Sequence, residues 1–303
     1  MIITKAQIMK ICAKLKHKYI DHKFLASGCH NDNFLLITDK DKLVLRIETN
    51  HQFKNMAREY SFLKKTKGKL GPKVFLLDNS KKIIPHNYLI EEFIEGKHPR
   101  KVDSKFIKSM AHWYKDLHKN RRKGMLNPLE KTSATKRYKK AKHTLGKDKE
   151  KETTEIYKLV KNCFNDNKKV FASDKYLALN HGDPSRRNIF YEHGQDNPKL
   201  IDWEFVRFNI AEADLAFFIW SYELDSRQIN YLLKQYGYKK SKKRLYLAMI
   251  RHSWAMLAWS LERYSLRLDD KLDKDKYPTS KRQVVMDVNR NIKIIKDYAN
   301  KLK

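Results

Sequence analysis

The stretch from Leu177 to Phe205 constrains the fold of this chain more than any other. Two short apolar runs, residues 188–191 and 199–201, flank a segment rich in Gly, Asp, Asn and Pro. Those residue types favour turns, so the pattern predicts a β-hairpin. Asp183 stands shortly before this hairpin, and Asp202 follows its second apolar run directly. The hairpin should therefore bring acidic side chains from both of its flanks together.

The polar residues around the hairpin match the needs of phosphoryl transfer. That reaction needs a carboxylate that orients the attacking hydroxyl, and oxygen ligands that hold Mg²⁺ against the nucleotide phosphates. His181-Gly-Asp183 with Asn188 gives H-G-D-x-x-x-x-N, and Asp202 opens D-W-E one hairpin later. Protein kinases carry H-R-D-x-x-x-x-N and D-F-G in the same order. One D-x4-N is expected roughly once by chance in a chain of this length, but three such groups in order are much rarer.

These residues together resemble the aminoglycoside phosphotransferase and choline kinase superfamily. The segment that follows is similar to the choline/ethanolamine kinase branch, where an Asn and an Asp-Leu-Ala come after the metal-binding acid; here they are Asn209 and Asp214-Leu-Ala. The resemblance implies that Asn188 and Asp202 hold Mg²⁺, and that Asp183 orients the substrate hydroxyl as the catalytic carboxylate. A buried acidic hairpin whose Asp and Asn only cap turns is the structural alternative.

The same resemblance implies an α+β, bilobal, protein-kinase-like fold with a small antiparallel-sheet N-lobe and a larger, mostly helical C-lobe. The segment that contains Glu91, Glu92 and Phe93 resembles the hinge between such lobes. There, backbone N–H and C=O groups can bind the adenine edge of ATP with little dependence on side chains. Gly96 fits a linker. We therefore expect an N-lobe over residues 1–95 and a C-lobe over residues 96–303.

A turn in the N-lobe is a candidate for covering the nucleotide phosphates. Strands are expected at residues 23–27, 34–38 and 42–48, and the turn joins the first two. In a kinase-like N-lobe, a turn at this place folds over the phosphates through its backbone N–H groups. Its single glycine fits an ordinary hairpin turn equally well. By resemblance to the Gly-x-x-Asn turn of the family, the candidate contacts are Ser27, Gly28 and Asn31.

Arg46 lies in the strand where a kinase fold sets the cation that contacts the phosphates. Choline kinases are similar in carrying Arg there, whereas protein kinases and aminoglycoside enzymes usually have Lys. An arginine can bridge phosphate oxygens in a bidentate manner. Glu59, on a helix expected from residue 54 to about 65, stands where the family places the glutamate that pairs with this cation. A surface arginine and a solvated glutamate are the structural alternatives.

The remaining chain is expected to be mainly helical. Apolar residues recur there at spacings of three and four, which is typical of amphipathic helices. The lysine-rich segment 120–152 carries few large apolar side chains and is expected to form a loop and an exposed helix. The other expected helices cover residues 4–19, 104–118, 154–165, 211–222, 226–236, 241–267 and 280–302.

The expected helix over residues 241–267 is similar to an aromatic-rich helix of choline kinases, whose rings enclose a trimethylammonium group. Cation–π attraction favours such a cage by about 1–2 kcal/mol per ring. Trp254 and Trp259 are therefore candidate substrate contacts. Their five-residue separation places them roughly 140° apart on a helix, so core packing is the alternative for at least one. Glu204 and Tyr222 are further candidates for contact with a cationic substrate.

The sequence thus predicts a kinase that transfers the γ-phosphate of ATP, with Mg²⁺, to a small alcohol. The resemblance favours choline or ethanolamine. Aminoglycosides, thiamine and sugars are the alternative acceptors, because the same catalytic loop serves them all. A strongly basic enzyme is an unfavourable partner for polycationic aminoglycosides.

The net charge of +31, from 66 Lys and Arg against 35 Asp and Glu, suggests a different class of function. Nucleic acid attracts such a protein electrostatically, so a polyanion-binding protein on a kinase-like scaffold is the non-enzyme alternative. Lysine is spread over nearly every segment, however, and no RNP1 or zinc-finger pattern occurs. We expect no specific nucleic-acid partner.

Cysteine usage and hydropathy favour a cytoplasmic enzyme. Cys12, Cys29 and Cys163 are odd in number, lie far apart and form no C-x-x-C pair, which suits a reducing compartment. The 12 histidines show no zinc-binding spacing. The longest apolar stretch, near residues 213–220, is too short and too charged to cross a bilayer. The oligomeric state is not determined by these patterns.

Overall fold

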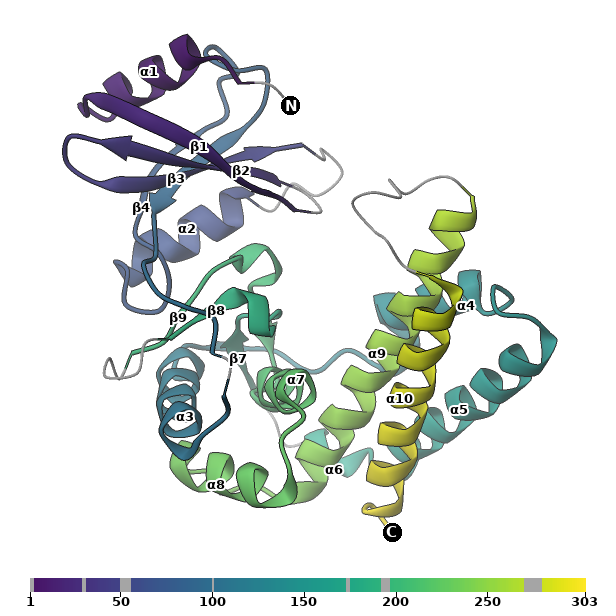
Figure 1. Cartoon of the computed structure of the whole chain (residues 1–303). Helices are drawn as coiled ribbons and strands as arrows, with labels where there is room; N and C mark the ends of the chain where they lie inside the picture. The colour runs from purple at the N-terminus through teal and green to yellow at the C-terminus, as the bar shows by residue number, and fades with distance from the viewer. Residues whose placement is uncertain are drawn as a thin grey trace. The chain divides into compact units, whose positions relative to one another are not determined.

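The computed structural model describes residues 3–28, 31–49, 56–99, 101–172, 175–191, 197–269 and 280–303. The chain packs as two compact units (Figure 1). The first unit is Met1–Trp113 with Arg186–Val206, and the second is Tyr114–Ser185 with Arg207–Lys303. This division does not test the expected lobe boundary at residue 95, which stays a prediction.

The first unit is built on a five-stranded antiparallel sheet with the order β1-β2-β3-β5-β4. Its strands are β1 (Tyr19–Ser27), β2 (Asn31–Thr38), β3 (Lys42–Glu48), β4 (Val74–Asp78) and β5 (Tyr88–Glu92). The strand expected at 42–48 is confirmed in full, and those expected at 23–27 and 34–38 are parts of longer strands. Cys29 and His30, in the turn between β1 and β2, lie outside the described residues.

Helix α1 (Lys5–Lys14) packs its apolar residues against this sheet. Thr4 and Gln7 form a capping box at its start, which satisfies backbone N–H groups that the helix itself leaves unpaired. Ile8 and Ile11 are fully buried in a core shared with the sheet residues Leu36, Leu43, Leu45 and Ile47. This apolar layer holds β3, which carries Arg46, in a fixed position.

Helix α2 (Met56–Thr66) and a short hairpin complete the described part of the first unit that matters for the site. The predicted hairpin is confirmed as β8 (Ile189–Phe190) paired with β9 (Lys199–Leu200). A short 3₁₀ turn, η3 (Trp203–Phe205), follows β9. The beginning of the helix expected from residue 54 lies outside the described residues, as do residues 192–196 of the hairpin loop.

The second unit is mostly helical. It also contains a small three-stranded sheet with the order β10-β7-β6. The strands are β6 (Arg121–Lys123), β7 (Tyr176–Asn180) and β10 (Arg207–Asn209), and the helices are α4 (Ser133–Ala141), α5 (Lys147–Asp166), α6 (Lys169–Ala172), α7 (Glu212–Tyr222), α8 (Ser226–Tyr236), α9 (Lys242–Leu268) and α10 (Lys281–Asn300). Helix α3 (Ser104–His118) contains the junction between the two units.

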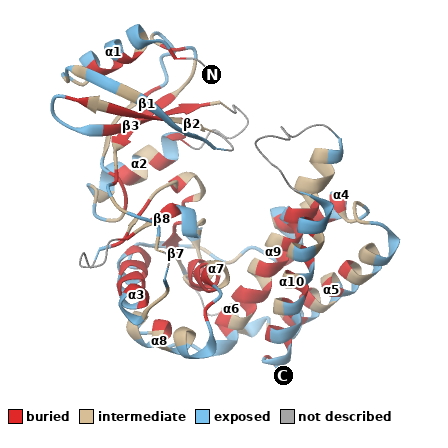
Figure 2. Ribbon diagram, in the orientation of Figure 1, coloured by how far each residue is buried: buried red, intermediate tan, exposed pale blue. Residues whose placement is uncertain are grey.

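Helix α9 is the central element of the second unit and packs against α10, α4 and α7. Figure 2 shows α7 buried along most of its length. The segment 120–152 is less exposed than predicted. Ala134, Tyr138 and Ala141 of α4 are buried, because Tyr138 packs its ring on Trp254 of α9 at 4.7 Å between centroids.

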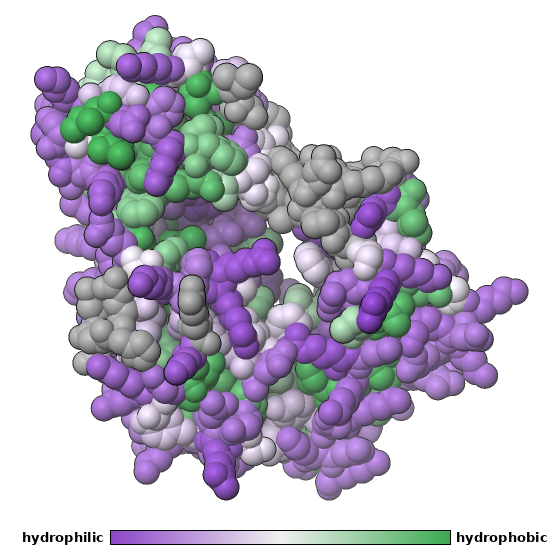
Figure 3. Space-filling view, in the orientation of Figure 1, coloured by the Kyte–Doolittle hydropathy of each residue, from purple (hydrophilic) through white to green (hydrophobic). Residues whose placement is uncertain are grey.

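An antiparallel sheet in the N-terminal part and a mainly helical remainder confirm the predicted α+β class. Hydrophilic residues cover most of the face shown in Figure 3, as expected for a chain with so many lysines. Of the helices in the described ranges, none has both the length and the apolar character that a membrane span requires.

Candidate active site

Arg46 is the centre of a charged cluster inside the first unit. It lies on β3, between β2 and β5, and only 5% of the residue is exposed. Its Nη1 donates to Oε1 of Glu59 at 2.5 Å, and its Nη2 donates to Oδ1 of Asp202 at 3.2 Å. Oε2 of Glu91 is 3.6 Å from Nη1. One guanidinium thus connects residues from a strand, a helix and the hairpin.

Glu59 holds two groups in place: the Arg46 side chain and the backbone next to Asp202. The same Oε1 atom accepts the backbone N–H of Trp203 at 2.9 Å. Asp202 has φ 64, in the left-handed region that costs a non-glycine residue about 1–2 kcal/mol. Such conformations persist where the surrounding structure enforces them, and they cluster at functional sites.

The ring of Trp203 anchors the end of the hairpin. It is fully buried, and its Nε1 donates to the carbonyl oxygen of Leu200 at 2.7 Å. A Cβ at Gly71 would stand 2.5 Å from that Nε1 and 2.8 Å from that oxygen. Only glycine therefore allows this close approach, which the sequence pattern did not predict.

Burial and charge together shift the acids of the cluster. Burial, reinforced by Glu59 and Asp202 and opposed by Arg46, raises the pKa of Glu91 to about 7. Burial also raises the pKa of Glu59, again against the effect of Arg46. Burial disfavours the charge of Arg46, but the three carboxylates outweigh this and raise its pKa, so it stays cationic. The Arg46 guanidinium thus faces three acidic side chains, so the binding of a further cation at this cluster is electrostatically favourable.

Asn188 and Asp202 lie at the same end of the hairpin. Ile189 is paired with Leu200, and one position further out the N–H of Ile201 donates to the carbonyl oxygen of Asn188 at 2.9 Å. Amide and carboxylate oxygens are ligands that Mg²⁺ prefers, and Mg²⁺ usually keeps waters and substrate phosphates as its other ligands. In the described ranges no three His, Cys, Asp or Glu side chains gather to hold a metal. The residues present fit a Mg²⁺ ion that is shared with phosphates.

Asp214, near the start of α7, anchors the loop that carries Asp183 in the second unit. Its carboxylate accepts the backbone N–H groups of His181 at 2.8 Å and Gly182 at 3.0 Å. His118 Nε2 lies 3.4 Å away, and His118 Nδ1 contacts the Tyr236 hydroxyl at 3.0 Å. Burial would raise the pKa of Asp214, but these partners hold it below its usual range.

The anchoring role of Asp214 was not assigned from the sequence, although the Asp-Leu-Ala segment was the available signal. Asp183 belongs to the second unit, whereas Asn188 and Asp202 belong to the first. Along the chain Asp183 precedes Asn188 by five positions. Joint action of these three residues stays a prediction.

The turn predicted to cover phosphates is closed by its own hydrogen bonds. Ser27 Oγ donates to Oδ1 of Asp32 at 2.5 Å, and the N–H of Gly28 donates to the carbonyl oxygen of Asn31 at 2.8 Å. Contact of Ser27, Gly28 and Asn31 with a nucleotide stays a prediction.

The segment predicted to bind adenine uses part of its backbone within the sheet. The N–H of Glu92 donates to the carbonyl of Lys73 at 2.7 Å, and that of Phe93 donates to the carbonyl of Lys42 at 3.2 Å. The side chain of Glu91 belongs to the Arg46 cluster. Adenine binding by this segment stays a prediction and would depend on its other backbone groups.

The four candidate substrate residues are not brought together within either unit. Trp254 is fully buried, with its ring stacked on Tyr157 at 5.2 Å, so it is part of the core. Trp259 is 39% exposed and has the Arg263 guanidinium 5.0 Å from its ring. Tyr222 is buried in the second unit, and Glu204 belongs to the first. Their substrate roles stay predictions.

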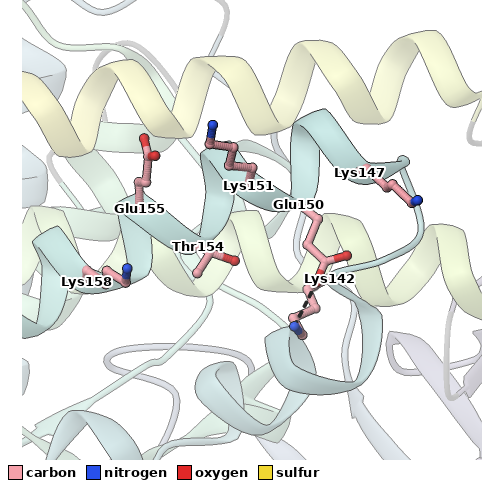
Figure 4. A pocket seen from close by; sticks show the side chains of 7 residues that line it. All are labelled: Lys142, Lys147, Glu150, Lys151, Thr154, Glu155 and Lys158. Atoms are coloured by element: carbon pink, nitrogen blue, oxygen red, sulfur yellow. Dashed lines mark hydrogen bonds and ion pairs between the residues drawn. The ribbon is translucent and has the colours of Figure 1, made fainter.

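A basic hollow of about 500 Å³ lies along α5 (Figure 4). Glu150 is already paired there, with Lys142 at 2.7 Å and with His143 at 2.6 Å. The lysines that line the hollow lie on the surface of the second unit. They are part of the positive charge that is spread over the whole chain. Four lysines and two glutamates dominate the lining: Lys142, Lys147, Lys151, Lys158, Glu150 and Glu155.

A strand arginine bonded to a helix glutamate and to the aspartate after a hairpin, in an α+β chain, is the arrangement expected of a kinase-like phosphotransferase. The sequence matches the model of the phosphotransferase enzyme family, APH, over residues 21–248, and the chain belongs to that family. The predicted superfamily is thereby confirmed. A search of the curated proteins finds no match.

Solved structures with similar folds cover nearly the whole chain. Choline kinase LicA from Streptococcus pneumoniae has a TM-score of 0.66 at 18% identity, over 96% of this chain and 98% of that one. Spectinomycin phosphotransferase APH(9)-Ia, in complex with ADP and spectinomycin, has 0.67 at 12%, over 100% and 98%. A choline/ethanolamine kinase family protein from Mesorhizobium loti has 0.65 at 15%, over 98% and 99%. At these identities the similarity confirms the kinase-like fold.

Proposed function

We propose that this protein transfers the γ-phosphate of ATP to the hydroxyl of a small alcohol. The observation that carries the proposal is the connected set Arg46, Glu59 and Asp202, held by bonds of 2.5 and 3.2 Å inside the first unit. A buried arginine bonded to two acids needs a reason, because burying charge is costly. Phosphate binding supplies one.

The chain's own residues have distinct roles in this proposal. Arg46 binds phosphate oxygens, and Glu59 holds both Arg46 and the backbone next to Asp202. Asn188 and Asp202 would hold Mg²⁺, which neutralises charge on the phosphates when bound. Asp183 orients the alcohol and accepts its proton, while Asp214 holds the loop of Asp183 in place. Positioning and charge neutralisation supply the rate enhancement.

We propose choline or ethanolamine as the acceptors to test first. The resemblance of Asn209 and Asp214-Leu-Ala to the choline/ethanolamine branch supports this choice, as does the presence of a choline kinase among the similar structures. Spectinomycin and kanamycin are acceptor candidates because other similar structures are complexes with them. The net charge of +31 disfavours such polycations.

The test is an ATP-dependent phosphorylation assay with purified protein and a panel of choline, ethanolamine, thiamine, spectinomycin, kanamycin and sugars. We expect Asp183→Ala to abolish turnover with the preferred acceptor without loss of folding. Asp116→Asn is the matched control, because this acid is 60% exposed and pairs with Lys119 on the surface. Full activity of Asp183→Ala would refute the assignment. Tight, salt-sensitive nucleic-acid binding without ATP turnover would favour the polyanion-binding alternative.

A further inference from the structure

Two neighbouring residues in the middle of α9, Arg251 and His252, are not explained by the proposed phosphoryl transfer. The His252 ring lies against two rings of α7, at 4.4 Å from Phe217 and 5.1 Å from Trp220. Its Nε2 atom is enclosed and has no hydrogen-bond partner in the described part of the chain. A buried polar atom without a partner costs about 1–3 kcal/mol, so such atoms in native proteins call for an explanation.

Two arginines act on His252, and one of them, Arg290, is also paired with Glu223 at 3.0 Å. Arg290 of α10 places its guanidinium 4.5 Å from the Trp220 ring and donates to the Trp220 carbonyl oxygen at 2.7 Å. Burial, together with the charges of Arg290 and of Arg207 on β10, lowers the pKa of His252 to about 3. His252 is therefore neutral at physiological pH, and one of its ring nitrogens can donate a hydrogen bond.

Arg251 differs from Arg244, the arginine that α9 buries. Arg244 is buried and bonded to Glu212 at 2.7 Å. Arg251 is half-buried, and among the described residues no carboxylate pairs with it; its Nη1 donates to the carbonyl oxygen of Asn127 at 3.0 Å. Burial, together with the charge of Arg207, lowers the pKa of Arg251 to about 10. Among the described residues, the Asn127 carbonyl is the acceptor for Arg251, so its other N–H groups can bind a ligand.

We propose that Arg251 and His252, with Arg207 of β10, form a binding site in the second unit for a carboxylate or phosphate group of a small molecule. An arginine fork binds either group with two parallel hydrogen bonds. The His252 ring adds a donor when Nε2 carries its proton. The rings of Phe217 and Trp220 supply an apolar wall, as is usual in small-molecule sites. The site goes beyond the proposed function and does not depend on it.

Inorganic phosphate is the probe, added to the full-length protein at constant ionic strength. The readout is the ring signals of His252 in NMR spectra, assigned by their loss in His252→Gln. We expect a saturable shift whose apparent Kd rises at least about tenfold in Arg251→Gln, since one charge-assisted pair is lost. Arg263→Gln is the matched control on the same helix, because that arginine contacts Trp259. It should change the Kd by less than about twofold.

The absence of a saturable shift in the wild-type protein, or an unchanged Kd in Arg251→Gln, would overturn the proposal. If Arg251→Gln does not fold, Arg207→Gln replaces it, since Arg207 is exposed on β10 and its loss should weaken phosphate binding in the same way. Because the readout is local to His252, phosphate that binds at Arg46 is not counted. Binding would be measured equally in a protein that has no kinase activity.

The anionic group could belong to the acceptor or to a separate effector, and a matched pair of alcohols distinguishes them. Serine differs from ethanolamine by one carboxylate. If the anionic group belongs to the acceptor, kcat/KM should be higher for serine than for ethanolamine. This preference should be lost in Arg251→Gln and kept in Arg263→Gln. An effector source predicts that phosphate changes turnover without competing with the acceptor.

Discussion

Replacing Asp214 with Asn should destabilise the protein by about 3 kcal/mol. The carboxylate is 1% exposed and accepts two backbone N–H groups, from His181 and Gly182. An asparagine can accept only one of them and turns its own NH₂ group toward the other, so one buried donor loses its partner. Loss of a charge-assisted bond and an unsatisfied donor each cost about 1–3 kcal/mol. For a chain of 303 residues, about 3 kcal/mol corresponds to a decrease in Tm of roughly 5 °C.

The effect of Asp214→Asn should depend on pH in a defined direction. The folded-state pKa of Asp214 lies below its usual range, so its contribution to the free energy of unfolding is present above the unfolded-state pKa of about 3.9. That contribution is lost as the pH falls through the lower, folded-state pKa. The stability difference between wild type and variant should therefore be full at neutral pH and narrow below about pH 4.

Urea unfolding at several pH values measures this difference. Asp225→Asn is the matched control, because Asp225 caps α8 by accepting the N–H of Gln228, and Asn caps helices as well as Asp does. We expect the control to stay within about 0.5 kcal/mol of wild type. A similarly small effect of Asp214→Asn at pH 7 would refute the anchoring role of Asp214. If the role holds, kcat should also decrease, because the loop that carries Asp183 loosens.

Four further substitutions test the site and the core. Arg46→Lys should lower kcat/KM at least about tenfold in the phosphorylation assay, because one ammonium cannot keep the fork that bonds Glu59 and Asp202; unchanged kinetics would contradict this. Trp254→Ala should destabilise the protein by about 3–5 kcal/mol in urea unfolding, whereas Trp259→Ala, at an exposed position, should cost less than about 1 kcal/mol; equal effects would show that burial is not the cause. Burial would raise the pKa of Asp78, but hydrogen bonds from Lys14 and Ser80 hold it below its usual range, so Asp78→Asn should destabilise at pH 7 and progressively less below about pH 4. If the difference in unfolding free energy between wild type and Asp78→Asn did not change with pH, the ion pair between Lys14 and Asp78 could not be its cause.

The sequence by itself determined the features that depend on neighbouring residues. The turn-forming segment between two apolar runs predicted the β8–β9 hairpin, and β3 forms over the predicted residues 42–48. The order of His181, Asp183, Asn188 and Asp202 predicted the family that the family model confirms. Local hydrogen bonding and periodicity are encoded over a few residues, and a sequence pattern can report them.

Only the tertiary structure decided which distant residues meet. Arg46 and Asp202 are 156 positions apart, and their contact depends on how α2 and the hairpin pack against the sheet. Likewise Trp254 and Trp259 have similar neighbours in sequence, yet one is fully buried against α4 and α5 and the other is exposed. Asp214 and Arg251 were singled out in the same way. Asp214 meets two backbone N–H groups and His118, whereas no carboxylate of the described residues pairs with Arg251. Burial and pairing are properties of the packed chain, because water and partner charges are removed or supplied only when remote segments come together.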